Sequence, residues 1–282
     1  MKIEKMGIIP NTRKEGIKKI ISDSIEMIPG DVEIWGNEEI SGISPRIRRV
    51  DSFGGADLIL ALGGDGTILH AARVVEKEQI PIMGIKIRSL GFLAEDNHRQ
   101  AIRELFAGGC NIQERMRLAA VHESGEENGN TALNDIVING VGVSRVLHIR
   151  MKINNTLLGE YLSDGVILST PTGSTAYSLA AGGPIIDPVR NDSIIITPLC
   201  PHSLSVRPVV VSSEEAIEIE VLEAGGKIIM TKDGQAGEEI ELEEKVTVKK
   251  SGRVTRLVVR DNYNFYTLVR EKLGWGGVLR RR

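Results

Sequence analysis

The sequence predicts an α/β + β fold: an N-terminal doubly wound α/β domain, a β-rich C-terminal domain, and a final helix that packs back on the first domain. Three observations predict it. Strand and helix signals alternate in the first third of the chain, short β-rich runs separated by Gly, Asn and Ser follow Cys110, and a helical pattern lies near the end. We expect residues 1–112, completed by residues 265–282, to form the first domain and residues 113–264 the second.

In the first domain, apolar runs of strand length occur at Met6–Pro10, Asp57–Leu62 and Ile80–Ile85. The run Asp57–Leu62 is continuously apolar after its first residue and follows a turn signal, which is typical of a parallel strand buried on both faces. Apolar residues at helical spacing predict helices over Arg13–Met27 and Thr67–Lys77. The alternation indicates βαβ units, with the loops at the carboxyl ends of the strands available for a ligand.

In the second domain, the runs are short and several of them alternate between apolar and polar residues, as in Ile217–Val221, which predicts mostly antiparallel strands. The small-residue segment Thr175–Ala181 is instead predicted to begin a helix, and Thr267–Leu273 has a helical pattern. The acidic patch Glu238–Glu244 is better explained as a solvated strand edge than as a metal site. The predicted strands are Leu118–Val121, Asp135–Val143, His148–Ile153, Val166–Ser169, Ile194–Thr197, Ile217–Leu222, Lys227–Thr231 and Val246–Lys249.

The composition excludes several classes of protein. With 282 residues, 41% hydrophobic and 26% charged, the chain can bury two cores and is not expected to be disordered. A formal net charge of -3 offers no basic field for nucleic acid or an anionic membrane, so neither partner is expected. The two cysteines, Cys110 and Cys200, lie far apart and are expected to be reduced and buried. No histidine pattern typical of a catalytic transition metal occurs.

The apolar segments of the sequence indicate where in the cell the protein is located. The N-terminus mixes charge into a short apolar run and reads as a first strand rather than a signal peptide. No stretch approaches the roughly 18 consecutive apolar residues that a membrane span needs. We therefore expect a cytoplasmic protein.

The turn Gly63-Gly64-Asp65-Gly66-Thr67, at the end of an apolar run, has the features of a phosphate-binding loop. Its glycines remove side chains where phosphates would approach, and the turn leads into a helix whose free N–H groups attract anions. It is neither a Walker A loop nor GxGxxG. A carboxylate beside phosphates is unfavourable unless it accepts a hydroxyl proton or holds Mg²⁺, although Asp65 could equally cap the helix.

Two further segments carry polar groups in places that favour a site. The run Ser163–Ile186 joins a buried strand to a hydroxyl-rich turn, in which Thr172, Ser174, Thr175 and Ser178 can donate to a ligand and Tyr177 offers a flat ring face; alone, such a run is only a capping signal. The pair Asn134-Asp135 interrupts an apolar strand, so at least one of the two side chains should enter the interior or a cleft.

With these segments in order along the chain, the sequence resembles the NAD kinase family, the ATP- or polyphosphate-dependent kinases that phosphorylate NAD to NADP. The most specific segment of the resemblance is Thr170–Tyr177. The glycine turn is less specific, because lipid kinases and phosphofructokinases look similar there. The resemblance rests on Gly63–Thr67, Leu133–Asp135, Ser163–Ile186, Asp233–Gln235 and Val269–Trp275.

The resemblance implies the two-domain fold, with an α/β nucleotide-binding domain, a β-rich NAD-binding domain and the dinucleotide in the cleft between them. It implies that Asp65 is the catalytic base toward the 2′-hydroxyl of the adenosine ribose, that the donor is ATP or polyphosphate with Mg²⁺ or another divalent cation, and that the protein is a homodimer or homotetramer. Asp65 belongs to the implied nucleotide-binding set as well, with Gly66, His70, Asn134, Asp135, His148, Asp164, Thr175, Ala176, Tyr177, Ser178, Leu179, Ala180 and Gln235.

Some of these residue assignments have weaker support in the sequence than others. His148 and Gln235 match the family more weakly, and His70 could reach a phosphate or be an ordinary surface histidine. Where the family often has Gly-x-Asn-x-Gly, this chain places Lys86 and Arg88 at the Asn and second Gly positions. These cations could strengthen donor binding, or Arg88 could narrow the loop. Phe92 could pack against the nucleotide, although core packing suits it better.

An Asp at its reference pKa of about 3.9 is already ionised at neutral pH and needs no tuning to act as a base. Two other functions stay open from the sequence. A lipid or diacylglycerol-type kinase would share the glycine turn but would need an apolar acceptor pocket. A noncatalytic NAD(P)-binding sensor would have no need of a carboxylate in the phosphate turn.

Overall fold

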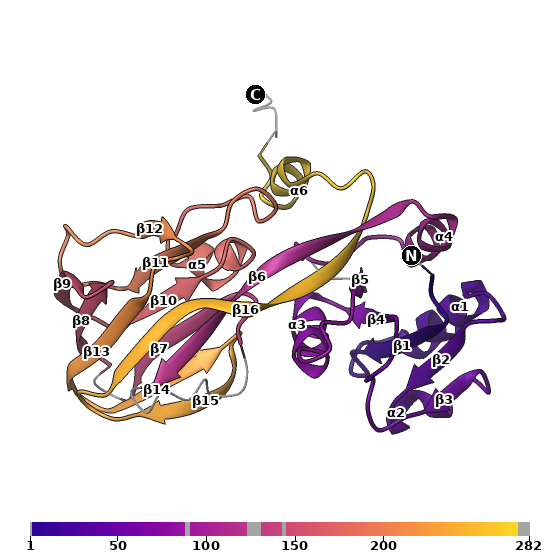
Figure 1. The fold of residues 1–282 in the computed structure, drawn as a ribbon, viewed down its shortest axis with the longest axis horizontal. Helices are drawn as coiled ribbons and strands as arrows, with labels where there is room; N and C mark the ends of the chain where they lie inside the picture. The colour runs from indigo at the N-terminus through magenta and orange to yellow at the C-terminus, as the bar shows by residue number, and fades with distance from the viewer. Residues whose placement is uncertain (1, 88–90, 123–130, 143–144, 276–282) are drawn as a thin grey trace, which may run out of the picture. The chain divides into compact units, whose positions relative to one another are not determined.

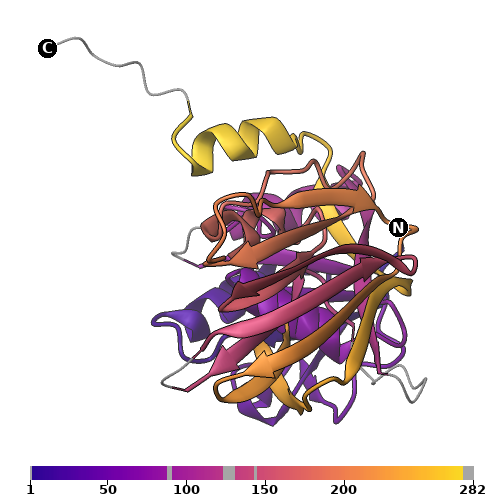
Figure 2. The ribbon, with the colours of Figure 1, turned by 90° about the vertical axis from the view of Figure 1, so that its left-hand side faces the viewer.

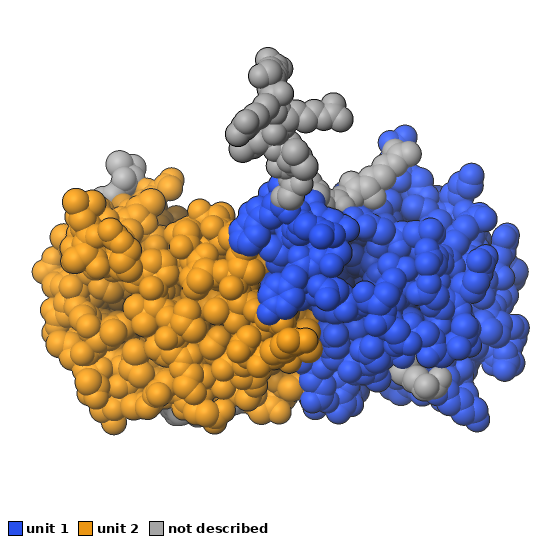
Figure 3. Space-filling view, turned by 90° about the horizontal axis from the view of Figure 1, so that it is seen from above, with its two compact units in different colours: residues 1–114, 255–282 blue, residues 115–254 orange. Residues whose placement is uncertain are grey.

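The structure is a computed structural model that describes residues 2–87, 91–122, 131–142 and 145–275. The chain forms two compact units, which Figure 3 distinguishes by colour. The first unit consists of residues 1–114 and 255–282, and the second of residues 115–254. Each unit has its own core of buried apolar side chains.

The first unit is built on a parallel sheet with the strand order β3-β2-β1-β4-β5 (Figure 1). The carboxyl-terminal part of β16 adds to its edge through the pairing of Leu257 with Ile82. The elements of the unit are β1 (Lys5–Pro10), α1 (Ile17–Met27), β2 (Glu33–Gly36), α2 (Glu38–Ser41), β3 (Ile47–Arg49), β4 (Leu58–Gly63), α3 (Asp65–Val74), β5 (Ile82–Lys86), α4 (His98–Ala107) and α6 (Phe265–Lys272).

Helices cover both faces of this sheet, which confirms the doubly wound prediction. One face carries Leu58, Leu60 and Leu62 into the same core as the apolar stripe of α1 and as α4. The other face faces α3, where Gly84 has no side chain and lets Ile68 approach; a Cβ on Gly84 would lie 2.2 Å from the Cδ1 atom of Ile68. The carboxyl ends of β1 and β4 are neighbours, at the point where the strand order reverses. Ligands bind outside such a point in open α/β sheets.

The chain returns to the first unit through the long strand β16 (Lys245–Arg260) and ends in α6. Asn264 caps α6, since its side-chain oxygen accepts from the N–H of Thr267 at 3.0 Å. Arg260 holds the segment that follows β5, because its Nε donates to Glu95 at 2.8 Å. The predicted final helix of the first domain is therefore present.

The second unit is a pair of antiparallel sheets. One has the order β12-β11-β10-β7-β14-β15, and the other joins the amino-terminal part of β16 to β13, β8 and β9, with β6 also paired to β16. This unit faces the viewer in Figure 2. Its strands, besides β16, are β6 (Cys110–His122, which begins in the first unit), β7 (Asp135–Val141), β8 (Leu147–Ile153), β9 (Thr156–Ser163), β10 (Gly165–Ser169), β11 (Ser193–Leu199), β12 (Val209–Ser212), β13 (Ile217–Ala224), β14 (Lys227–Lys232) and β15 (Gln235–Ile240).

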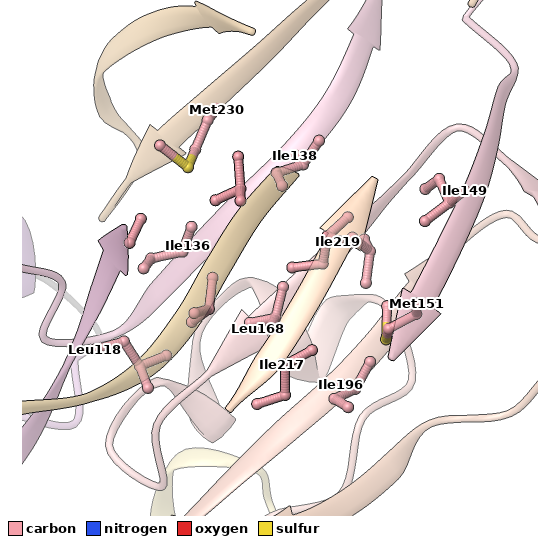
Figure 4. Packing of buried hydrophobic residues seen from close by; sticks show 14 of the residues in the cluster. Leu118, Ile136, Ile138, Ile149, Met151, Leu168, Ile196, Ile217, Ile219 and Met230 are labelled. Atoms are coloured by element: carbon pink, nitrogen blue, oxygen red, sulfur yellow. The ribbon is translucent and has the colours of Figure 1, made fainter. Parts of the chain in front are cut away.

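The core of the second unit lies between its sheets. Alternate residues of each strand point inward, such as Ile136 and Ile138 of β7 facing Ile217 and Ile219 of β13 (Figure 4). Their neighbours in sequence, Asp135, Val137 and Asn139, therefore lie on the outer face of the six-stranded sheet. That face carries the short 3₁₀ turn Gly173–Thr175 and helix α5 (Tyr177–Ala180) in place of a third sheet.

The structure also tests the predictions for the two cysteines and for the acidic patch. Both cysteines are free, but Cys200 is exposed and Cys110 half-buried, so the prediction of two buried thiols is wrong. The first three residues of the acidic patch, Glu238–Ile240, lie in β15, which is the last strand of its sheet, and the remaining residues follow this strand. None of the helices in the described part of the chain has the length and apolar character that a membrane crossing requires.

Candidate functional site

The glycine turn lies where the strand order of the first unit reverses. It connects β4 to α3, and the absence of a side chain on Gly63 lets the hydroxyl of Thr67 come close; a Cβ there would lie only 2.0 Å from the Oγ1 atom of Thr67. Gly66, by contrast, is exposed with no heavy atom near a would-be Cβ. The turn therefore presents open backbone and the start of a helix, which suits an approaching phosphate.

Asp65 is the first residue of α3, and its carboxylate does not cap the helix. Instead, one oxygen accepts from the N–H of Phe92 at 2.8 Å and the other from the N–H of Leu93 at 3.1 Å. The helix N-cap is Gly64. The alternative of Asp65 as a cap is therefore wrong: the carboxylate is aimed across the carboxyl end of the sheet at the segment after β5.

The surroundings of Asp65 act in opposite directions on the pKa of its carboxyl group. Burial raises the pKa of its carboxyl, while the N–H groups of Phe92 and Leu93 and the charges of Lys272 and Lys86 act to lower it. The net direction is upward, so the expectation of an untuned Asp needs correction. A raised carboxyl pKa makes the group a stronger base once it is ionised, which suits proton abstraction from a hydroxyl.

Polar residues of the second unit gather on the outer face of its six-stranded sheet. A hollow of about 370 Å³ is lined there by Asn134, Asp135 and Asn139, with Tyr177 and Ala176 above the sheet. Asn134 and Asp135 are 8% and 4% exposed, as expected for polar groups that enter a cleft. The full lining is Asn134, Asp135, Val137, Asn139, Ala176, Tyr177, Thr231, Asp233 and Gly234.

Asp233 organises this hollow, although only its motif, and not its role, could be seen in the sequence. It has a left-handed backbone (φ 55°) in the turn between β14 and β15. Its carboxylate accepts three backbone N–H groups, of Leu133 at 3.0 Å, of Asn134 at 2.6 Å and of Asp135 at 3.3 Å. In return, the N–H of Asp233 donates to the carbonyl of Asp135 at 2.9 Å. This closed set of bonds fixes the Asn-Asp pair.

The carboxyl of Asp135 lies in a place that disfavours its charge. Burial, with a further contribution from the Asp233 carboxylate, raises the pKa of Asp135 from 3.8 to about 7. Between these two values the folded protein binds a proton that the unfolded chain releases. Stability from this group is therefore fully present at low pH and is lost as the pH rises toward 7.

We predict that Asp135→Asn reduces this loss, because the amide stays neutral at every pH. Thermal unfolding measured from pH 5 to pH 8 should show a fall in the melting temperature of the wild type that levels off above pH 7, and a smaller fall in the variant. Asp31→Asn, at an exposed carboxylate, is the matched control and should behave as the wild type. Equal pH slopes for Asp135→Asn and the wild type would contradict the assignment.

The hydroxyl-rich segment is tied to the Asn-Asp pair. Thr170 donates its hydroxyl to the carbonyl of Leu133 at 2.6 Å and its N–H to the carbonyl of Asn134 at 2.9 Å. Gly173 packs directly on this backbone, because a Cβ there would lie 2.0 Å from the carbonyl oxygen of Asn134. Both segments of the resemblance therefore build one surface.

Most of the hydroxyls in this segment are used internally, which corrects the expectation that they donate to a ligand. Ser174 is fully buried and donates to the carbonyl of Pro171 at 2.6 Å, and Ser178 is fully buried at 3.0 Å from the hydroxyl of Thr197. Thr175 donates to the carbonyl of Thr172 at 3.3 Å. Tyr177 is different, since its side chain is 49% exposed and reaches over the hollow.

A second hollow, of about 320 Å³, continues the first along the same face. Tyr177 and Asn139 line both hollows, and Asp164 and Arg145 line the second. The sequence therefore predicted Asp164 and Tyr177 as parts of one surface, but missed Asn139 and Arg145. Asn139 could have been found, because it follows Asp135 at the two-residue spacing of a strand face.

Some of the expected site residues lie elsewhere. His148 is on β8, in the other sheet of the second unit, with its Nε2 3.6 Å from Glu160. His70 is exposed on α3 with Arg73 3.4 Å from its ring. Gln235 begins β15 beside Gly234 without lining the hollow, and Leu179 and Ala180 follow Tyr177 in α5 without lining it either. Arg88 lies outside the described residues, whereas Lys86 lies at the end of β5 beside Gly63.

The described residues contain no group of three or more His, Cys, Asp or Glu side chains placed to hold a metal ion together. Two of the acidic side chains described above, those of Asp65 and Asp233, accept backbone N–H groups. A divalent cation that arrives on the phosphates of a substrate would bring most of its ligands with it.

Comparison with known proteins agrees with this arrangement. Residues 7–109 match the model of the ATP-NAD kinase N-terminal domain, and residues 133–259 match that of the ATP-NAD kinase C-terminal domain. The chain is 37% identical to a NAD kinase of Thermoanaerobacter sp. (strain X514) over 281 residues, which are 96% of this chain and 99% of the relative.

Two solved structures share the fold. A yeast NADH kinase complexed with NADH has a TM-score of 0.86 at 23% identity, over 99% of this chain and 90% of its own. A NAD kinase from Archaeoglobus fulgidus in complex with ATP has a TM-score of 0.76 at 22% identity, over 96% of this chain and 98% of its own. The identity to the Thermoanaerobacter relative, over nearly the whole of both chains, shows that this chain belongs to the NAD kinase family.

Proposed function

We propose that the protein transfers the terminal phosphoryl group of ATP or polyphosphate to the 2′-hydroxyl of the adenosine ribose of NAD, with Asp65 as the base. The observation that best supports this role of Asp65 is the direction in which its carboxylate points. Both oxygens are held by the N–H groups of Phe92 and Leu93, outside the helix that Asp65 begins and beside the open glycine turn. Positioning of this kind is the main contribution of a protein to phosphoryl transfer.

The residues of the second unit supply the acceptor side in this proposal. Asn134 and Asp135 contact the ribose or the groups near the pyrophosphate, and Tyr177 and Ala176 surround the adenine end with Asp164. What supports this is the polar hollow on the outer sheet face and the exposed ring of Tyr177 above it. A tyrosine ring stacks on any flat base, while the buried amide and carboxyl select hydroxyl groups.

Three further parts of the proposal concern the surroundings of the reaction. Mg²⁺ or another divalent cation enters with the donor phosphates and neutralises the charge that develops on them. The protein works in the cytoplasm as a homodimer or homotetramer. His70 would lie on the approach to the glycine turn, since it is exposed one helical turn after it. His148, Gln235, Leu179 and Ala180 are given no role.

Placement of the Asp65 carboxylate can be tested at Gly91. A Cβ on Gly91 would lie 2.4 Å from the Oδ1 atom and 2.9 Å from the Cγ atom of Asp65, so Gly91→Ala must displace this carboxylate. A misplacement of about 1 Å in a reacting group costs on the order of 100-fold in rate. We predict a fall in kcat of that order, measured by coupled NADP detection.

The control for Gly91 is Gly42→Ala. Gly42 also lies in the first unit, with no heavy atom within reach of a Cβ and a φ of −81° that any residue adopts. This variant should keep the kcat of the wild type. A Gly91→Ala enzyme with unchanged kcat would show that the position of Asp65 does not limit the reaction.

The function as a whole is tested by a panel of acceptors. Purified protein is incubated with Mg²⁺, with ATP or polyphosphate, and separately with NAD, NADH or diacylglycerol, and phosphorylated products are separated by chromatography. We expect NADP with NAD as acceptor and no phosphorylated lipid. Phosphatidic acid as the product would favour a lipid kinase, and binding of NAD without any product would favour a sensor.

A further inference from the structure

Two lysines, Lys86 and Lys272, meet beside the glycine turn. Lys86 is the last residue of β5 and pairs in register with Gly63, the last residue of β4. It lies on the same face of the sheet as Gly84, which is the face that α3 covers. Its side chain therefore shares with Asp65 the end of the sheet where the open turn lies.

The second lysine comes from the far end of the chain. Lys272 is the last residue of α6, and its side chain is only 9% exposed. Its Nζ lies 3.9 Å from a carboxylate oxygen of Asp96, and the Nζ of Lys86 forms an ion pair with the other oxygen of the same carboxylate. Two ammonium groups thus share one counter-ion, which is itself 61% exposed.

The surroundings of Lys86 lower the pKa of its ammonium group. Glu271 and Asp65 act to keep it protonated, yet desolvation and the nearby Lys272 outweigh them and lower the pKa of Lys86 to about 8. Both lysines also act on Asp65 by opposing the rise in its pKa. Two partly buried ammonium groups that share one largely exposed carboxylate form an attractive place for an anion of higher charge than that carboxylate.

We infer that Lys86 and Lys272 form a binding site for the terminal phosphates of the phosphoryl donor, and that Asp96 is the counter-ion which those phosphates displace. This inference rests on the proposed function and names the donor side of the same site. Lys86 then acts as a group that contacts substrate. The chemistry recognised is a chain of phosphates, which both ATP and inorganic polyphosphate offer.

Kinetics of matched variants test the inference. Lys86→Met should raise the KM for the donor at least about tenfold and change the KM for NAD by less than about twofold. Lys86→Arg keeps the positive charge, so its donor KM should stay much closer to that of the wild type. Lys272→Met should act in the same direction. Lys77→Met is the control, because Lys77 is exposed on the same unit and should change neither constant. Running the series with ATP and with polyphosphate shows which donor uses the pair.

Asp96→Asn separates a binding role from a structural ion pair. If the phosphates displace Asp96, this variant frees the lysines and should leave the donor KM equal to or lower than that of the wild type. If the pair merely stabilises the fold, Asp96→Asn and Lys86→Met should raise the donor KM alike and lower the melting temperature alike, and the inference is wrong. An unchanged donor KM in Lys86→Met also overturns it.

The pH dependence adds a readout that a structural role would not move. The groups that face Lys86 are Lys272 and Glu271 from α6, Asp65 from α3 and Asp96 from the segment after β5. Because Lys86 loses its proton near pH 8, the donor KM of the wild type should rise above that pH, and the rise should be absent in Lys86→Arg. A donor KM that is flat from pH 7 to pH 9 would count against the site.

A binding measurement keeps this inference distinct from the proposed function. Inorganic tripolyphosphate is titrated calorimetrically into the wild type and into Lys86→Met, without NAD. Weaker binding to the variant supports the phosphate site even if the wild type forms no NADP, in which case only the proposed function fails. Equal binding, with NADP formed normally by both, removes the site and leaves the proposed function intact.

Discussion

Replacing Asp65 by Asn should lower kcat for NADP formation by at least about 100-fold, since a positioned general base contributes on the order of 10²–10⁴ in rate. The amide cannot take the ribose proton, although it has nearly the same shape as the carboxylate. NAD binding, which we assign to the second unit, should stay within about threefold of the wild type. The two quantities are measured by coupled NADP detection and by calorimetric titration with NAD.

The Asp65→Asn variant needs a control for structure, because the carboxylate also binds two backbone N–H groups. An Asn oxygen can accept one of them, but its NH₂ group would face the other. Asp65→Glu keeps the charge but moves it by one methylene. In this variant the hydrogen bonds to the N–H groups of Phe92 and Leu93 should be impaired less than kcat. A melting temperature within a few degrees of the wild type for Asp65→Asn, with kcat unchanged, would remove Asp65 from the role of base.

The second large effect is expected from Gly173→Ala. A Cβ at this position would lie 2.0 Å from the carbonyl oxygen, 2.5 Å from the carbonyl carbon and 2.7 Å from the Cα atom of Asn134. All three atoms belong to the backbone, so no side-chain rotation relieves the contact. Overpacking of this kind destabilises proteins by about 1–3 kcal/mol, and a backbone neighbour places this case at the upper end.

Gly173→Ala should also weaken NAD binding, because separating the two backbones moves Asn134 away from the segment that carries Ala176 and Tyr177. Denaturant unfolding and titration with NAD measure the two losses. Gly159→Ala is the control in the same unit, on β9, where nothing lies near a would-be Cβ. If Gly173→Ala were as stable and as tightly bound to NAD as Gly159→Ala, the packing of these segments would have no part in the site.

The elements that could be predicted from sequence are those whose pattern reports burial directly. The strand β4 is a continuous apolar run with every residue buried, and α1 places Ile17, Ile21 and Ile25 on one face. The strand β9 was missed because it is an edge strand, in which Leu157 and Leu158 are exposed and no alternation develops. Of β6 only Leu118–Val121 was predicted, since most of the residues before this run are polar or charged.

The site was predictable in its motifs and not in its contacts. The glycine turn, the Asn-Asp pair and Tyr177 carry their chemistry in short segments. The clamp of Asp233 on the N–H of Leu133 joins positions 100 residues apart, which no local pattern reports. The same holds for Lys272, which α6 brings to Asp96 and Lys86. The hydroxyl-rich run misled in a different way, because seryl hydroxyls that could serve a ligand serve equally well to hold a turn.

The central claim is tested most directly by the identity of the product. Purified protein is incubated with NAD, ATP and Mg²⁺, and the products are followed by phosphorus NMR. We expect a phosphomonoester on the 2′-oxygen of the adenosine ribose, formed in equal amount with ADP and at least about 100-fold more slowly by Asp65→Asn. Formation of ADP without this phosphomonoester, or an equal rate of its formation by Asp65→Asn, would contradict the account.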